Sequence, residues 1–404
     1  MVPPFRRNFN ERFSDSRYHE LLAGLARDCG VPIEFRISET PCFFPARVID
    51  RFASEAVELI GQLLGSEAYL RQAAGVVPEA FRLPRSEHRP TFVQVDFGIV
   101  RTGPGPEDVE GRLVELQAFP SLYAFQLLLA ETMQRHWDLD SVRLFPAHAS
   151  RDEYLRTVGW AMTGGHDPAE VVLMEIAPDT QKTRPDFAMT RTLWGVRTID
   201  VRSVRRDGRQ LLYQRDGQWT RIRRVYNRLI PDDVLRLGLD LPFDYRDELD
   251  VEWTGAPDWF YKISKFSIPF LEHPWVPRTV LLSELDPAAA GDHFPGGLAE
   301  VVLKPLFAYA GSGIVFGPSA AGLAAVPAAE RHLYVCQERV PFTPVIDTPH
   351  GPTQAELRMM FVRTDDGYRC VLPLVRMGRG KMMGVDHNKG LSWVGASAAL
   401  IAVH

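Results

Sequence analysis

Cysteine is scarce in this sequence, and its four residues form no Cys-x-x-Cys pair: Cys29, Cys42, Cys336 and Cys370. This spacing indicates neither a zinc site nor a disulfide framework. We therefore expect reduced thiols in a cytoplasmic protein. Residues 1–7, Met-Val-Pro-Pro-Phe-Arg-Arg, also lack the apolar segment of a secretory signal peptide.

Long hydrophobic runs and an excess of positive charge are missing as well. No uninterrupted apolar run reaches the length that spans a membrane, so we expect no membrane partner. The formal charge is −5, from 46 basic and 51 acidic residues, whereas general nucleic-acid binders are normally basic. With 45% hydrophobic and 24% charged residues, the composition is that of a soluble globular protein without a nucleic-acid partner.

The length of 404 residues favours two or three domains over one compact core. Residues 1–90 are predicted to be mainly helical, because apolar residues recur at helical spacing, for example at Tyr18, Leu21 and Leu25. At residue 91 the pattern changes to period two. Further changes in the spacing of apolar residues place domain boundaries after residues 140 and 255.

Two strands, 92–97 and 112–117, flank a turn rich in glycine and proline, which predicts a β-hairpin, and residues 119–133 are predicted to form a helix. Strands at 171–176 and 196–201 have a helical segment between them, and this order indicates an open α/β sheet. Later strands are predicted at 334–338, 356–362 and 371–376.

The most informative segment is 302–315, Val-Leu-Lys-Pro-Leu-Phe-Ala-Tyr-Ala-Gly-Ser-Gly-Ile-Val. An apolar strand delivers Lys304, and a loop of small residues follows at once, which we call the lysine loop. An ammonium group beside bare backbone N–H groups is suited to holding the phosphates of a nucleoside triphosphate. The segment is not a Walker loop, because no Gly-Lys-Ser/Thr opens a helix. A plain strand–turn–strand hairpin with a surface lysine is the alternative.

Further motifs surround the lysine loop in a definite order. The series is Lys265, 277–279, Lys304, 337–338, 356–358, Arg376 and Asn388. This order resembles an ATP-grasp enzyme, but the acidic metal strands that usually end that fold do not follow Asn388. An acidic hairpin with Asp96 and Glu115 stands near the front instead. The arrangement resembles the circularly permuted ATP-grasp group, which includes the synthetase domain of glutathionylspermidine synthase.

The resemblance covers residues 91 to about 390 and implies a circularly permuted ATP-grasp fold of the α/β (α+β) class. Residues 91–140 would be the permuted metal-binding hairpin with its helix, and 141–255 an open α/β substrate domain. Residues 256–404 would form the ATP-binding lobe. The helical N-terminal segment, 1–90, lies outside the resemblance.

The resemblance also implies ATP and Mg²⁺ as cofactors. The residues that would bind ATP are Lys265, Lys304, Ala310, Gly311, Ser312, Gly313, Gln337, Glu338, Arg339 and Val340. Asp96, Glu115 and Gln117 would bind the metal, because Mg²⁺ prefers oxygen ligands and residues i and i+2 of a strand share a face. Gln117 stands where the family has asparagine. A hairpin with one ordinary polar row is the alternative.

Two arginines on apolar strands, Arg358 and Arg376, are the predicted catalytic residues. A planar guanidinium suits the oxygens of a transferred phosphate, although both arginines could simply pair with Glu356 or Asp366. The candidate substrate residues are Asn227, Arg228 and Asn388. The first two lie at a strand end, and open α/β sheets bind ligands beyond the carboxyl ends of their strands.

The function that we expect is an ATP- and Mg²⁺-dependent carboxylate–amine ligase that forms an amide through an acyl phosphate. Its partners would be small-molecule or peptide carboxylates and amines. Two alternatives stay open: a phosphotransferase that acts on a small acceptor, and a non-catalytic nucleotide-binding or interaction module. The sequence leaves the oligomeric state open, with a homodimer as one option.

Overall fold

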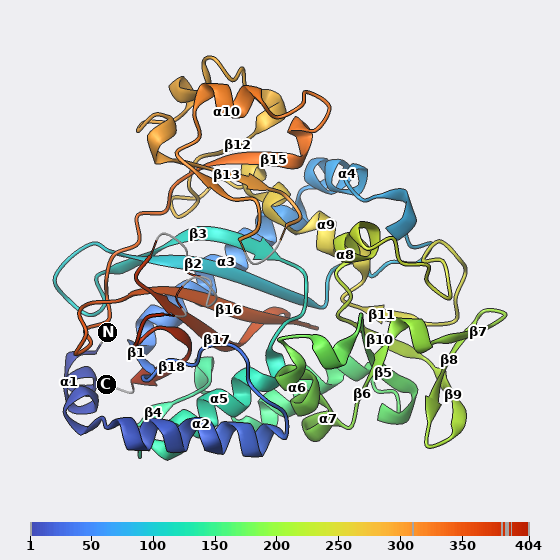
Figure 1. Cartoon of the computed structure of the whole chain (residues 1–404), viewed down its shortest axis with the longest axis horizontal. Coiled ribbons are helices and arrows are strands. Elements are labelled where there is room, and N and C mark those ends of the chain that lie inside the picture. Colours follow the sequence, from blue (N-terminus) through green and yellow to red (C-terminus); the bar gives the residue numbers. More distant parts are fainter. Residues whose placement is uncertain (1, 309–310, 381–382, 384–387, 389, 403–404) are drawn as a thin grey trace.

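The computed structural model describes the chain except for residues 1, 309–310, 381–382, 384–387, 389 and 403–404. It is a mixed α/β structure with several sheets (Figure 1). The strands of its central sheet, in spatial order, are β1 (Cys42–Pro45), β18 (Gly395–Ala402), β17 (Gly367–Gly378), β16 (Gln354–Thr364), β2 (Phe92–Arg101) and β3 (Val109–Gln117). The short strand β4 (Val142–Arg143) also pairs with β18.

The predicted hairpin near the front of the chain joins the strands near its end. Strands β2 and β3 pair antiparallel, and β2 also pairs antiparallel with β16, from Phe92 opposite Val362 to Gly98 opposite Glu356. Between Asp96 and Phe97 the register of β2 on β3 shifts by one residue, which makes Val114 an extra residue in β3. Such bulges bend a strand and redirect its groups.

The first 90 residues form helices, as predicted, and also one strand that the sequence analysis missed. The helices are α1 (Pro3–Arg12), α2 (Asp15–Cys29), α3 (Ala46–Gly65) and α4 (Glu67–Gly75). Strand β1 pairs parallel with β18, with Cys42 opposite Ala399. Its four residues are too few to show a period of two. One continuous apolar core runs from Phe9 to Ile401, so this segment shares the core of the central sheet.

Strand β18 was also missed, because alanine and serine dominate its sequence and these residues favour strands weakly. Its pairing with β17 and β1 forms it, and all eight residues are buried. Helices α5 (Tyr123–His136) and α3 pack against this sheet (Figure 1). Among the described residues, the helices are all too short or too polar to cross a lipid bilayer.

The predicted open α/β sheet is present in the middle of the chain. Its parallel strands are β11 (Glu252–Thr254), β10 (Arg224–Asn227), β5 (Val171–Glu175) and β6 (Arg197–Asp200). Its helices are α6 (Arg151–Thr163), α7 (Arg184–Trp194), α8 (Pro231–Arg236) and α9 (Pro257–Lys262). A meander of β7 (Arg205–Asp207), β8 (Gln210–Arg215) and β9 (Gln218–Ile222) extends from it (Figure 1).

A small antiparallel lobe contains the lysine loop. Its strands are β12 (Thr279–Leu281), β15 (Tyr334–Glu338), β13 (Val301–Pro305) and β14 (Val315–Phe316), with the short helix α10 (Ala320–Ala324). The lobe has a separate apolar core, which includes Leu282, Phe294, Leu303 and Cys336. Figure 1 shows it above edge strand β3. Two cores therefore meet along this edge.

A buried carboxylate joins the α/β unit to the helix that follows the hairpin. Asp186 on α7 accepts backbone N–H groups of Leu122, Ala124 and Phe125 at 3.0, 2.9 and 3.0 Å, at the start of α5. It also accepts Nη1 of Arg228 at 2.7 Å, and both side chains are almost fully buried. A carboxylate at a helix N-terminus is favourable. Asp186 thus fixes the start of α5 relative to β10.

We expect Asp186→Asn to lower the free energy of unfolding by about 3–5 kcal/mol, because it removes the carboxylate that is paired with the buried Arg228 guanidinium. Urea denaturation measures the loss. Exposed Asp179→Asn is the matched control and should change stability by less than about 0.5 kcal/mol. Asp186→Asn combined with Arg228→Met should recover part of the loss. Equal losses in the single and double variants would contradict the ion-pair explanation.

Candidate functional site

A cavity of about 580 Å³ lies between the small lobe and the central sheet. Strand β13 and the lysine loop form one wall, and the hinge segment, residues 337–342, forms another. The central sheet contributes β3, β16 and β17. The predicted site residues that line this cavity are Glu115, Lys265, Lys304, Gly311, Ser312, Gln337, Glu338, Arg339, Val340 and Arg376.

Two more of the predicted residues belong to the lysine loop. Ala310 falls outside the described residues. Gly313 lies in the lysine loop with φ of 70°, and a Cβ there would be 2.8 Å from Cγ of Pro305, so glycine permits this turn. Strands β13 and β14 on either side confirm a strand–loop–strand arrangement.

Lys304 lies in the cavity wall and is largely buried. Nζ donates to the side-chain oxygen of Gln337 and to the carbonyl of Val114 at 3.4 Å, and the residue is 7% exposed. Val114 is the bulged residue of β3, so the bulge aims its carbonyl at Lys304. Burial lowers the pKa of Lys304 to about 8, although Glu115 and Glu356 act to raise it.

Lys265 approaches the same cavity from the turn Lys265–Phe270. Its Nζ donates to the carbonyl of Ala308 at 2.7 Å and lies 3.5 Å from Oε2 of Glu115. Burial acts to raise the pKa of Glu115, but Lys265, Arg358, Arg376 and Lys304 outweigh it and lower this pKa to about 2. Glu115 is therefore an ionised carboxylate at the cavity wall.

The pairing of the strands explains how charged residues gather on one face of the central sheet. Asp96 stands opposite Glu115 on β3 and opposite Arg358 on β16. Glu356 stands opposite Arg376 on β17. Directly paired residues point to the same face, as do residues i and i+2 of a strand. These five residues form what we call the charged face.

Asp96 has two guanidinium partners in place of the metal ion that the sequence predicted. Nε and Nη2 of Arg358 donate to its two carboxylate oxygens at 2.6 and 2.6 Å, and Arg376 also donates to Oδ2. Asp96 is 0% exposed. The geometry does not support a metal ligand at Asp96, because strand pairing brings Arg358 directly opposite it. Arg358 likewise lies beneath the cavity rather than in its wall.

Gln117 is directed into the protein by a neighbour that the sequence analysis missed. Its amide donates to Oε1 of Gln94, which also accepts Nη1 of Arg358 at 3.0 Å. Gln94 in turn donates to the carbonyl of Ser121 at 2.6 Å. Gln94 lies two residues before Asp96 on β2, so the two side chains point to the same face of the sheet. This spacing could have identified Gln94 as a site residue from the sequence.

Glu356 and Arg376 form an ion pair in the cavity wall, which is one of the pairings that the sequence left open. Burial raises the pKa of Glu356 to about 7; Arg376 and Arg358 oppose this shift, while Asp96 and Glu115 add to it. Burial acts to lower the pKa of Arg376, but Glu356, Asp96 and Glu115 raise it above its ordinary value. Arg376 thus stays charged.

Two hinge residues use their backbone N–H groups within the small lobe. Glu338 donates to the carbonyl of Arg278 at 2.8 Å, and Arg339 donates to the carbonyl of Glu300 at 2.7 Å. Both residues were predicted to bind ATP, but these two N–H groups do not point to the cavity. These two donors are engaged because β15 continues its pairing up to the hinge.

Arg379 is a cavity residue that was not among the predicted site residues. Its Nη1 donates to the carbonyl of Ser392 at 2.9 Å, and its Nη2 to Oγ1 of Thr348 at 3.1 Å. Its backbone N–H donates to Oδ1 of Asn388 at 3.2 Å. Asn388 is buried and supports the backbone of Arg379, but it does not line the cavity itself.

The predicted substrate residues Asn227 and Arg228 lie at the end of β10, as expected, but neither lines the cavity. Arg228 is 2% exposed and stacks between the rings of Phe119 and Phe187, at 5.4 and 5.2 Å from their centroids. Asn227 donates to the carbonyl of Gly255 at 3.0 Å. The structure therefore does not bring them together with the other candidate residues.

Two carboxylates of the cavity wall suit the oxygen ligands that magnesium prefers. Mg²⁺ usually binds one or two carboxylates together with the phosphates of a substrate. Glu115 and Glu356 are carboxylates in the wall that lie opposite the lysine loop. These two fit a single ion that arrives with phosphates, whereas Asp96 and Gln117 do not fit.

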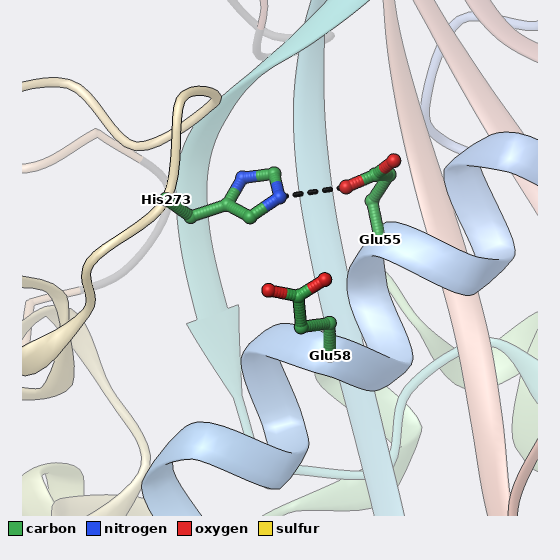
Figure 2. A group of neighbouring side chains, drawn as sticks. All are labelled: Glu55, Glu58 and His273. Atoms are coloured by element: carbon green, nitrogen blue, oxygen red, sulfur yellow. Dashed lines mark hydrogen bonds and ion pairs between the residues drawn. The ribbon is translucent and has the colours of Figure 1, made fainter.

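A second cluster with metal-binding residue types lies elsewhere, at Glu55, Glu58 and His273 (Figure 2). Nδ1 of His273 accepts the backbone N–H of Trp275 at 3.0 Å. In the neutral ring Nε2 then carries the proton, and it contacts Oε2 of Glu55 at 2.6 Å. Both ring nitrogens are engaged, so the cluster is a hydrogen-bonded link between α3 and the segment before β12.

Gly98 allows the hinge to contact the central sheet. A Cβ at Gly98 would lie 2.6 Å from Cγ1 of Val340 and 2.8 Å from Cε1 of Phe342. We expect Gly98→Ala to lower the free energy of unfolding by about 1–3 kcal/mol, because overpacking displaces the hinge. Gly61→Ala is the matched control, because its helical site has space; it should be neutral or stabilising. Equal thermal midpoints for both variants would contradict this role of Gly98.

No protein-family model and no curated protein sequence matches this chain. Among solved structures, the chain is similar to a glutathione synthetase-like effector from Globodera pallida in its apo form. The two are 10% identical with a TM-score of 0.58, and the match covers 100% of this chain and 99% of the other. At this identity the likeness concerns the fold alone. The chain therefore shares the fold of a glutathione synthetase-like protein over its whole length.

Proposed function

We propose that the cavity binds ATP and that the chain is an ATP-dependent carboxylate–amine ligase. The observation that carries this proposal is the convergence of Lys265, Lys304 and Arg376 on one cavity beside the lysine loop. These residues come from three separate segments of the chain. The volume of about 580 Å³ is typical of small-molecule sites.

The charge of the cavity suits a polyphosphate. Among the described residues, the charged side chains of the wall are the cations Lys265, Lys304, Arg339, Arg376 and Arg379 and the carboxylates Glu115, Glu338 and Glu356. Five positive and three negative groups give an excess of two positive charges when all are ionised. A cleft lined by one sign of charge attracts the opposite ion. Apolar Val302 and Ile314 offer a wall for the adenine ring.

The proposed reaction depends on positioning and charge rather than on a covalent nucleophile. The substrate carboxylate would attack the γ-phosphate of ATP, giving an acyl phosphate and ADP, and an amine would then displace phosphate to form the amide. Lys265 and Lys304 would neutralise the phosphates, and Arg376 would orient the transferred group. Closure of the lysine loop would exclude water. Magnesium, held by Glu115 and Glu356, would supply further neutralisation of charge.

The fold supports a circularly permuted ATP-grasp arrangement. The front hairpin, β2–β3, pairs with β16, so the acidic strands of the hairpin share one sheet with the C-terminal strands. The glutathione synthetase-like fold of the neighbour supports amino acids or small peptides as substrates. We propose such molecules as the carboxylate and amine partners.

A second candidate is a nucleotide-binding module without turnover. It is favoured by the guanidinium groups that bind Asp96 and by the inward direction of Gln117. Both observations remove predicted metal ligands from the cavity. The fold and the cavity support nucleotide binding in either case.

The affinity for ATP is expected to fall as the pH rises from about 7 to about 9, because Lys304 loses its charge near its pKa of about 8. At one unit above this pKa the affinity should be about tenfold weaker. Calorimetry with a non-hydrolysable ATP analogue measures it. Lys304→Arg keeps the charge and should remove this pH dependence, whereas Lys304→Met should bind weakly at every pH. A flat profile for the unaltered protein would contradict the assignment.

Turnover is expected to need a carboxylate and an amine together, measured as phosphate release over a screen of amino acids, small peptides and polyamines. Glu115→Gln should lower the rate by about 100-fold or more, because it removes the charge of a carboxylate that would hold magnesium. Glu110→Gln on the same strand is the matched control and should keep the rate. Phosphate transfer without an amine would favour a phosphotransferase, and binding without release would favour the second candidate.

A further inference from the structure

Arg358 lies between two carboxylates of the charged face. Its guanidinium contacts both oxygens of Asp96 at 2.6 and 2.6 Å, and Nη2 lies 3.9 Å from Oε1 of Glu115. Nη1 donates to Gln94 at 3.0 Å, and Gln94 accepts Gln117 as well. The hairpin residues predicted to bind a metal thus surround a guanidinium, directly or through Gln94.

The position is built for a permanent positive charge. Arg358 is 6% exposed and Asp96 is 0% exposed, so water contributes little to screening the pair. A guanidinium does not lose its proton in proteins and matches a carboxylate with two parallel hydrogen bonds. Strand pairing fixes Arg358 directly opposite Asp96. The pair therefore belongs to the fold itself.

The carboxylates of the cavity wall also have protein cations beside them. Lys265 lies 3.5 Å from Glu115, and Arg376 forms an ion pair with Glu356. A metal ion that bound these carboxylates would weaken both existing contacts. The gain in attraction to the phosphates would be offset by this loss, so the ion would add little to the affinity for a nucleotide.

We infer that Arg358 is a built-in cation at the position predicted for a metal, and that the cavity binds the polyphosphate of a nucleotide without a divalent metal ion. The inference rests on the proposed binding of ATP in this cavity. Under this inference, nucleotide binding depends on the fixed cations of the protein. Any requirement for magnesium then concerns turnover alone.

The test is calorimetric titration of the full chain with a non-hydrolysable ATP analogue, in excess EDTA and in excess magnesium chloride. We expect dissociation constants that agree within about threefold. Binding that weakens in EDTA by about tenfold or more would overturn the inference while leaving the proposed function in place. Absence of binding in both solutions would overturn the proposed function and the inference with it.

A variant links the result to Arg358. Arg358→Met should weaken binding in EDTA by about tenfold and should make binding respond to magnesium, because Asp96 and Glu115 would lose the cation that lies between them. Arg363→Met, an exposed position on the same strand, is the matched control and should bind as the unaltered chain does. If Arg358→Met binds the analogue equally in EDTA and in magnesium, with unchanged affinity, Arg358 is not the resident cation.

Loss of the buried ion pair can prevent folding of Arg358→Met. Asp96→Asn combined with Arg358→Met removes both charges and leaves groups of similar size, and replacing both partners costs less than removing one. Circular dichroism checks its fold. This double variant should also bind more weakly than the unaltered chain in EDTA. Unchanged affinity in a folded double variant would overturn the inference.

Discussion

The ion pair between Asp96 and Arg358 is the interaction on which the charged face depends. It lies between β2 and β16, strands that are far apart in the sequence, and it holds Arg376 through the second oxygen of Asp96. Buried charges are tolerated only when they are paired. The pair therefore fixes where the remaining charges of the face stand, and it leaves Glu115 and Glu356 as the carboxylates of the charged face that line the cavity.

The cavity exists because two apolar cores meet along one edge. The small lobe has its own core, and its hinge rests on Gly98 of the central sheet, where a side chain would collide with Val340 and Phe342. Lys304 reaches across this boundary to the carbonyl of Val114, which the bulge in β3 exposes. Packing, backbone irregularity and a buried ammonium thus act together to hold the lobe over the charged face. A nucleotide bound there would contact both parts.

Much of the fold was predictable from local pattern. The hairpin β2–β3, strands β5 and β6 of the α/β unit, the strand–loop–strand around Lys304 and the C-terminal strands β15 to β17 all follow from the period of the apolar residues and from the turn residues. Strands β1 and β18 did not, since one has four residues and the other consists mainly of alanine and serine. Both strands form because they pair with each other and with neighbouring strands. The residue pattern of one strand does not show which strand it will pair with.

The sequence by itself determined the residue types of the candidate site and the order in which they follow one another, because an ordered set of lysines, arginines and carboxylates on strands is visible without coordinates. Only the tertiary structure decided which of them share a cavity. Asp96 and Gln117 carry oxygen atoms that could bind a metal. Both side chains instead form hydrogen bonds with cross-strand neighbours, Asp96 with Arg358 and Gln117 with Gln94. Asn227 and Arg228 stand at a strand end, yet Asp186 and Phe119 cover the guanidinium. The physical reason is that hydrogen-bond partners across a sheet are set by register and packing, which are properties of the assembled fold.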